Sequence, residues 1–169
     1  HTAAAAPDAT LGNLPLQRTS FVGRKRDLSV AGELLAASRL LTLTGAPGAG
    51  KTRLALRLAQ DLSRDYPDGT FFVSLASVTE ARQLEPAITA ALESANAFGG
   101  TEAGESAGGS SLGQRLGRRR LLLVLDNLGQ VPEAAGPVAQ LLDSAEMPTI
   151  LATSRAPLGV AGERVFAVA

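Results

Sequence analysis

The chain has 169 residues, of which 45% are hydrophobic, and 16 Lys and Arg side chains balance 16 Asp and Glu, so the formal net charge is zero. This length fits one compact domain with a sizeable core, and a neutral chain has no overall field that would draw it onto nucleic acid or a membrane. The absence of cysteine excludes disulfides and thiolate metal sites and suits a location in the reducing cytoplasm. No apolar run approaches the roughly 18 residues that cross a bilayer, so no membrane partner is expected.

The two ends of the sequence differ from its middle. Residues 1–13 are rich in alanine and polar residues, which predicts a flexible linker, so the folded domain is expected to span residues 14–169. The chain begins without methionine and stops on the apolar stretch 165–169, from which we expect a segment of a longer protein. Inside the domain, the stretch 98–111 is rich in Gly, Ser and Glu and predicts a flexible surface loop.

The first predicted elements are a helix and a strand. Apolar residues recur at helical spacing over residues 24–38, which predicts an amphipathic helix. The short run at 40–44 is apolar and β-branched and is closed by Gly45, which predicts a buried strand.

The segment after this strand matches the phosphate-binding P-loop pattern G-x-x-x-x-G-K-[ST] at every fixed position. Its glycines let successive backbone N–H groups surround a phosphate, and the following helix points its positive end at the same anion. We expect Lys51 to reach the β- and γ-phosphates and the Thr52 hydroxyl to bind Mg²⁺. A glycine-rich turn before a helix is the alternative interpretation. The candidate nucleotide-binding residues are Gly45, Ala46, Pro47, Gly48, Ala49, Gly50, Lys51 and Thr52.

Helices and strands continue to alternate after the P-loop. Leucines repeat every four residues and predict a helix over 51–65, and an apolar run predicts a strand at 71–75. The next predicted helix is 80–94, where Pro86 marks a possible kink or break. A short helix is expected at 112–116.

The third predicted strand, 121–125, runs into Asp126. In P-loop proteins a strand beside the P-loop strand ends in an aspartate that holds the Mg²⁺ shell, so Asp126 is the candidate metal partner, although an aspartate also commonly begins a turn. Many ATPases carry a second acid at the next position, but here it is Asn127, whose amide can orient water without accepting its proton. We therefore expect any hydrolysis to be slow or to depend on an acid elsewhere.

The last predicted elements are a helix over 131–144 and strands at 149–153 and 165–168. Arg155 follows the fourth strand, and the carboxyl ends of strands line the ligand crevice of open α/β sheets. An arginine there can contact a γ-phosphate, although a solvated loop arginine is the alternative. Lys51, Asp126 and Arg155 are thus the candidate catalytic residues.

The basic triplet 118–120 is interpreted as a solvated boundary before a strand rather than a nucleic-acid contact. The alternation of strands and helices predicts an α/β fold with a parallel sheet covered on both faces.

Three segments together resemble a known family. They are Phe21-Val22-Gly23-Arg24, the LLLVLDN run at 121–127 and the ILATSRAPLGVAGERV run at 150–165. This set resembles the STAND ATPases, in particular the NB-ARC-like nucleotide-binding domains of large bacterial transcriptional regulators, which usually add a SARP-type or LuxR-type DNA-binding domain and a helical repeat sensor. The resemblance covers residues 14–169.

The resemblance implies a P-loop NTPase three-layer sandwich with a parallel five-stranded sheet in the order 5-1-4-3-2. It implies that Val22 and Arg24 lie near the adenine and its sugar, that residues 45–52 hold the phosphates of ATP or ADP, that Asp126 holds Mg²⁺ and that Arg155 contacts the γ-phosphate. Proteins of this family act as switches that open when ATP replaces ADP and then assemble. The resemblance therefore implies nucleotide-dependent self-association of the full-length protein, with DNA contacted only through domains absent from this chain.

Two departures from the family pattern bear on turnover. Gly129 stands where an acidic residue is often found, and the sequence stops before the helical and winged-helix domains that close over the nucleotide in the family. A regulatory nucleotide switch is the leading hypothesis. A P-loop kinase or motor ATPase with fast turnover and an interaction module with a degenerate P-loop are the alternatives. The intact Lys51 and Thr52 argue against the interaction module.

Overall fold

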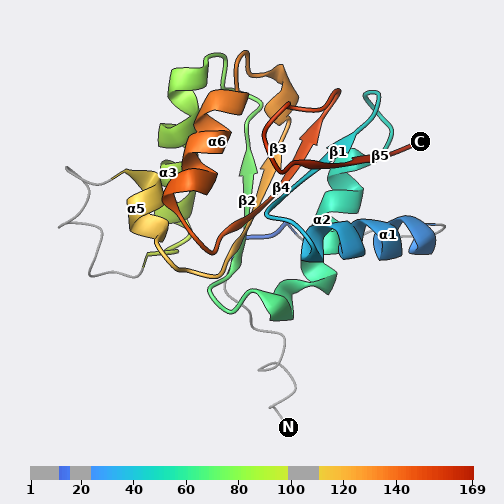
Figure 1. Cartoon of the computed structure of the whole chain (residues 1–169), viewed down its shortest axis with the longest axis horizontal. Helices are drawn as coiled ribbons and strands as arrows, with labels where there is room; N and C mark the ends of the chain where they lie inside the picture. Colours follow the sequence, from blue (N-terminus) through green and yellow to red (C-terminus); the bar gives the residue numbers. More distant parts are fainter. Residues whose placement is uncertain (1–11, 16–23, 99–110) are drawn as a thin grey trace, which may run out of the picture.

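The computed structural model of the chain describes residues 12–15, 24–98 and 111–169. In this part of the chain, a five-stranded sheet lies between two layers of helices (Figure 1). The strands are β1 (Leu40–Thr44), β2 (Thr70–Ser74), β3 (Leu122–Asp126), β4 (Thr149–Ser154) and β5 (Arg164–Ala167). The helices are α1 (Lys25–Ala36), α2 (Lys51–Asp61), α3 (Leu84–Ser94), α5 (Leu112–Leu116) and α6 (Ala135–Ser144), and 3₁₀ turns cover Ser63–Asp65, Ala81–Gln83 and Leu128–Gln130.

The strand order is β2-β3-β4-β1-β5, and every neighbouring pair is parallel. Read from the other edge, this is the predicted order 5-1-4-3-2, which is confirmed, as is the α/β P-loop NTPase fold. The strand that leads into the P-loop, β1, lies between β4 and β5. The carboxyl ends of β1 and β4 are level, since Thr44 pairs with Ser154. Residues that follow these strands are therefore brought to one edge of the sheet.

The central strands of the sheet are buried on both faces, as alternate residues of β3 show, whereas the edge strand β5 is largely exposed. Leu123 and Leu125 face the layer of α3, α5 and α6, whereas Leu122 and Val124 face the layer of α1 and α2. A strand with both faces covered needs apolar residues at every position, which explains why the continuous apolar runs were readable as strands. Among the described residues, no helix has both the length and the apolar content needed to span a bilayer.

Two helices have different boundaries in the structure from those predicted from the sequence. The helix expected over 131–144 begins only at Ala135, because Glu133 has φ 57°, which a right-handed helix does not allow. The segment expected as one helix over 80–94 is a 3₁₀ turn followed by α3. Pro86 lies in the first turn of α3, where its missing N–H costs no helical hydrogen bond, so it does not break that helix.

The amino-terminal end of the described chain lies along the edge of the sheet. Gly12 forms a parallel bridge with Thr70 of β2. The side chain of Asn13 donates to the carbonyl of Phe72 and accepts from its N–H. Hydrogen bonds to β2 therefore extend to Gly12 and Asn13, the last two residues of the expected linker. The rest of the expected linker, and nearly all of the loop expected at 98–111, lie outside the described residues.

The turn after β3 packs tightly against β4. A Cβ added at Gly129 would lie 2.1 Å from Oγ and 2.9 Å from Cβ of Ser154. The Ser154 hydroxyl is itself held in place, because it donates to the carbonyl of Ala156 and accepts from its N–H. Position 129 therefore has no room for the acidic side chain that the family often carries there.

We expect Gly129→Ala to lower the free energy of unfolding by about 1–3 kcal/mol, the usual cost of overpacking. Because Ser154 supplies the nearest atoms, the loss should be smaller in a Ser154→Gly background. Gly136→Ala is the matched control, since a Cβ there meets no atom within 4 Å, and it should be neutral or slightly stabilising. Chemical denaturation of the four variants and the wild type measures these differences. Equal effects of Gly129→Ala in both backgrounds would contradict the packing described.

Candidate functional site

The P-loop connects the carboxyl end of β1 to the first turn of α2. Gly45 closely approaches the residue that follows β5, since a Cβ there would lie 2.7 Å from the carbonyl oxygen of Val168. Gly50, the N-cap of α2, has φ 93° and provides no side chain to cap the helix. The N–H groups of the first helical turn are therefore left to another partner, and a helix N-terminus of this kind is suited to an anion.

The side chains of Lys51 and Thr52, at the start of α2, point to different parts of the carboxyl edge of the sheet. The ammonium of Lys51 donates to the carbonyls of Gly45 and Ala46 at 2.6 and 3.0 Å, so it lies over the P-loop itself. The hydroxyl of Thr52 donates to Oδ1 of Asp126 at 2.7 Å. The structure thus brings together Thr52 and Asp126, the two residues that the sequence selected for Mg²⁺.

A third hydroxyl completes this cluster. Thr153, at the end of β4, donates to the same Oδ1 of Asp126 at 2.8 Å and accepts from the backbone N–H of Asn127 at 2.9 Å. Asp126 and Thr153 are 7% and 1% exposed, so the hydrogen bond between them is shielded from water. Sequence reasoning did not select Thr153. The available signal was its place at the end of a predicted strand, immediately before Ser154 and Arg155.

A cavity of about 290 Å³ opens beside the P-loop. Its volume is close to the lower end of the range for small-molecule sites, about 300–1,000 Å³. It is lined by Pro47, Lys51, Asn127, Gly129, Gln130, Ser154 and Arg155. Arg155 and Lys51 therefore border the same cavity, Arg155 from the chain after β4 and Lys51 from the first turn of α2. None of these seven lining residues carries a carboxylate.

Two amide side chains, those of Asn127 and Gln130, border the cavity. Asn127 has φ 65°, a conformation that Asn tolerates better than most residues. The Gln130 side chain donates to the carbonyls of Leu75 and Ala76, and so fastens the segment after β2. The cavity is therefore bordered by amide side chains, which can donate or accept hydrogen bonds but are poor bases.

Arg24 lies against the P-loop rather than in this cavity. Its Nη2 donates to the carbonyls of Ala49 and Ala169 at 2.9 and 3.1 Å, and its Nη1 forms an ion pair with Asp27 at 3.0 Å. The guanidinium thus joins the P-loop to the chain that leaves β5. Val22, the other residue expected near the adenine, lies outside the described residues.

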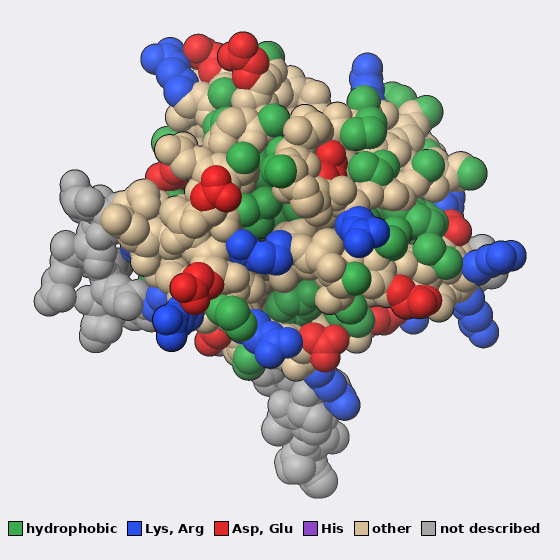
Figure 2. Space-filling view, in the orientation of Figure 1, with side chains coloured by type: hydrophobic (Ala, Val, Ile, Leu, Met, Phe, Trp, Pro, Cys, Tyr) green, Lys and Arg blue, Asp and Glu red, His purple; other side chains and the backbone are tan. Residues whose placement is uncertain are grey.

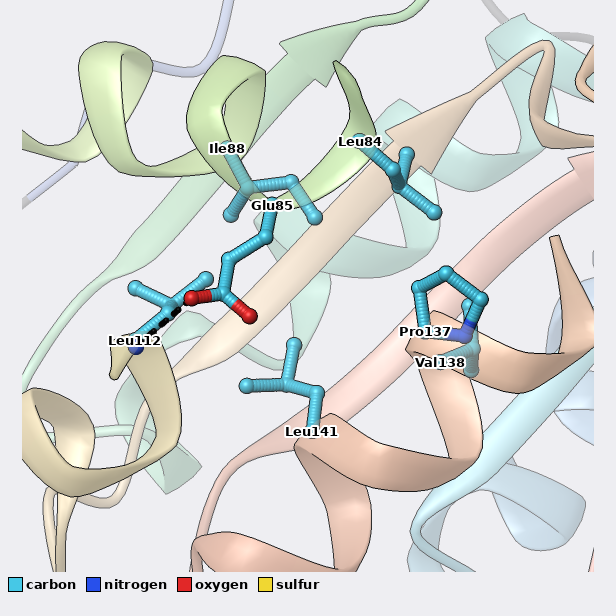
Figure 3. A pocket seen from close by; sticks show the side chains of 7 residues that line it. All are labelled: Leu84, Glu85, Ile88, Leu112, Pro137, Val138 and Leu141. Carbon is cyan, nitrogen blue, oxygen red and sulfur yellow. Dashed lines mark hydrogen bonds between the residues drawn. The ribbon is translucent and has the colours of Figure 1, made fainter. Parts of the chain in front are cut away.

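Two further cavities have different surroundings. One of about 380 Å³ lies at the opposite end of the sheet, where Arg39, Tyr66 and Thr149 are among the lining residues. Although it is larger, it contains no part of the P-loop, and burial raises the pKa of Tyr66 and lowers that of Arg39. The other is an apolar slot between α3, α5 and α6 with only about 10 Å³ of space, where the Glu85 carboxylate accepts from the N–H of Leu112 (Figure 3). Neither has the phosphate-binding features of the P-loop edge.

The surface charges are mixed in sign. Figure 2 shows Lys and Arg interspersed with Asp and Glu on the face in view, without an extended basic patch over the described residues of that face. In the basic triplet, Arg118 pairs with Glu146, and Arg119 donates to the carbonyl of Arg115. The backbone N–H of Arg120 donates to Asp68. These contacts support the interpretation of the triplet as a boundary before β3.

Sequence relatives come from mycobacteria. A Mycobacterium tuberculosis protein named "Putative HTH-type transcriptional regulator Rv0890c" is 43% identical over 136 residues, which cover 80% of this chain and 14% of that protein. "Uncharacterized protein Rv0894" from the same species is 37% identical over 151 residues, which cover 89% of this chain and 37% of that protein. The chain thus spans well under half the length of these relatives.

Solved structures with a similar fold include two archaeal proteins. The Cdc6p protein of Pyrobaculum aerophilum superposes with a TM-score of 0.59 at 18% identity, over 91% of this chain and 47% of that one. The Orc1 protein of Aeropyrum pernix, solved in complex with DNA, gives a TM-score of 0.56 at 22% identity, over 88% and 46%. At these identities the likeness concerns the fold.

A protein family described as "AAA domain" matches residues 36–156 of this chain, which include the P-loop, Asp126 and Arg155. This match covers most of the chain. It agrees with the sheet order and with the hydrogen bond between Thr52 and Asp126. The chain therefore belongs to the AAA domain family and is a P-loop ATPase domain.

Proposed function

We propose that this domain is a regulatory switch that binds ATP or ADP with Mg²⁺ and hydrolyses ATP slowly or not at all. The observation that carries the proposal is the complete P-loop whose Thr52 is hydrogen-bonded to Asp126. In this assignment, residues 45–52 bind the phosphates. Arg155, which borders the same cavity as Lys51, contacts the γ-phosphate, and Val22 and Arg24 lie near the adenine and its sugar.

The residues present fit both nucleotide and metal. The first turn of α2 has no side-chain cap, and Lys51 lies beside it. A hydroxyl and a carboxylate are oxygen ligands of the kind Mg²⁺ prefers. Among the described residues, no cluster of three or more His, Cys, Asp or Glu could hold a metal by itself, which suits an ion shared with phosphates and water. When bound, Mg²⁺ supplies neutralising charge to the phosphates.

The switch is favoured over fast turnover because none of the described residues that line the cavity carries a carboxylate that could act as a base. Asn127 follows Asp126, and position 129 is closed to a side chain by Ser154. Asp126 itself accepts from two hydroxyls, a role that suits holding a metal shell. A slow site remains in its ATP-bound or ADP-bound form long enough for that form to be read.

The biological setting is part of the same proposal. The name of the relative Rv0890c supports a place in a transcriptional regulator. The STAND or NB-ARC-like type and the cytoplasmic location are proposed from the sequence motifs and the absence of cysteine. DNA is then contacted by other domains of that protein. Nucleotide-dependent self-association belongs to the full-length protein.

Nucleotide binding should raise the melting temperature of this fragment in the presence of Mg²⁺. A ligand that binds only the folded state adds about 2.7 kcal/mol at a hundredfold excess over Kd. Lys51→Ala should reduce the shift, because it removes the cation that faces the phosphates. Lys25→Ala, on the exposed part of α1, is the matched control and should retain it. The absence of a shift in the wild type at millimolar ATP and ADP would argue strongly against the proposal.

Turnover should be well below the typical enzyme value of about 10 per second. Phosphate release under saturating MgATP measures it. Asn127→Asp tests the missing acid, since Asp tolerates the left-handed backbone at this position, and it should speed release if the missing base limits the rate. A wild-type rate of tens per second would instead favour the kinase or motor ATPase reading.

The fragment alone should not bind DNA with sequence preference. Specific binding requires side chains at base edges together with a basic surface that contacts the phosphates. The net charge of this chain is zero, which does not favour such a surface. Any weak association should disappear by about 200 mM salt. Fluorescence anisotropy at that ionic strength decides the question. Sequence-selective binding tighter than about 10⁻⁷ M would place a DNA reader inside this domain.

A further inference from the structure

The crossover from β4 to β5, residues 155–163, lies over the sheet on the side of α3, α5 and α6. Leu158 and Val160 belong to the apolar cluster on this face. Arg155 begins the crossover and Glu163 ends it. The segment thus carries the proposed γ-phosphate contact, Arg155, at one end and a carboxylate, Glu163, at the other.

Glu163 ties this crossover together from within. Its Oε2 accepts from the backbone N–H of Leu158 at 2.9 Å, and its Oε1 accepts from that of Gly159 at 2.9 Å. The backbone of Glu163 also closes a turn, because its N–H donates to the carbonyl of Val160 at 3.0 Å. One carboxylate therefore fixes the middle of the crossover to its end.

The same carboxylate reaches the strand that carries the P-loop. Oε2 of Glu163 accepts from the hydroxyl of Thr42 at 2.5 Å, across 121 positions of sequence. Thr42 is 0% exposed, in the middle of β1 and three residues before Gly45. A displacement of the crossover relative to β1 would break this hydrogen bond and leave a buried hydroxyl without it, which is costly.

Arg155 is therefore placed between two anchors. On its amino side, the Ser154 hydroxyl exchanges hydrogen bonds with Ala156. On its carboxyl side, the N–H groups of Leu158 and Gly159 are held by Glu163. The exposed Arg155 side chain borders the cavity that Lys51 borders from the P-loop. The hydrogen bond to Thr42 thus sets the crossover that bears Arg155 relative to the strand that bears the P-loop.

We propose that Glu163 is a positioning residue that holds Arg155 at the distance from the P-loop at which it distinguishes ATP from ADP. This inference rests on the proposed function of Arg155 as the γ-phosphate contact. The carboxylate is required because three donors converge on it. A glutamine has a single acceptor oxygen, and its NH₂ group would face a donor.

The test is the ratio of the dissociation constants of ADP and ATP, each measured by titration in Mg²⁺. The variants are Arg155→Gln, Glu163→Gln and the double variant. Arg155→Gln should lower the preference for ATP about tenfold, the size expected for one charge-assisted contact. Glu163→Gln should lower it severalfold, and the double variant should be no lower than Arg155→Gln alone, because both changes remove one contact. Glu146→Gln, whose side chain is 70% exposed, is the control and should match the wild type.

A purely structural role for Glu163 predicts a different result. Glu163→Gln would then weaken ATP and ADP equally and leave their ratio unchanged, which overturns the inference while Arg155→Gln still lowers the ratio. If Arg155→Gln itself leaves the ratio unchanged, the γ-phosphate assignment of Arg155 fails and the role of Glu163 fails with it, while nucleotide binding by the domain stands. Should Glu163→Gln not fold, Thr42→Val removes the bond from the other side, and an unchanged ratio there also overturns the inference.

Discussion

The candidate site depends on one buried carboxylate. Asp126, at the end of β3, accepts hydrogen bonds from Thr52 in the first turn of α2 and from Thr153 at the end of β4. A charged acceptor in a shielded place needs such donors, because burying it without them is expensive. The contact holds β3, β4 and the helix of the P-loop in one arrangement, so the three segments that border the cavity cannot move independently without losing it.

The polar network around this contact determines what the edge can do chemically. Lys51, Arg155 and the uncapped turn of α2 favour an anion, and Thr52 with Asp126 suits a hard cation. Ser154 closes position 129, and amides border the cavity where a base would be expected. Glu163 then joins the strand of the P-loop to the crossover that carries Arg155. This arrangement supports our proposal that the site binds a nucleotide and reports its form rather than turning it over rapidly.

Much of this arrangement was predictable because its signals are local. The apolar runs identified the strands, and the P-loop pattern identified the candidate phosphate site, since both depend on neighbouring residues. The predicted start of α6 was wrong, because an apolar pattern does not reveal the left-handed conformation of Glu133. Thr153 and Glu163 were missed for another reason. Their roles arise from partners distant in sequence, such as Thr42, 121 positions from Glu163, and a threonine or glutamate alone carries no signal of such a partner.

The most direct measurement is a crystal structure of this domain grown with Mg²⁺ and a non-hydrolysable ATP analogue. The account predicts density for the phosphates along residues 45–52, with the metal beside Thr52 and Asp126 and the terminal phosphate facing Arg155. Density for the nucleotide in the cavity of about 380 Å³ at the opposite end of the sheet would contradict it. So would a P-loop free of nucleotide at concentrations that saturate binding in solution.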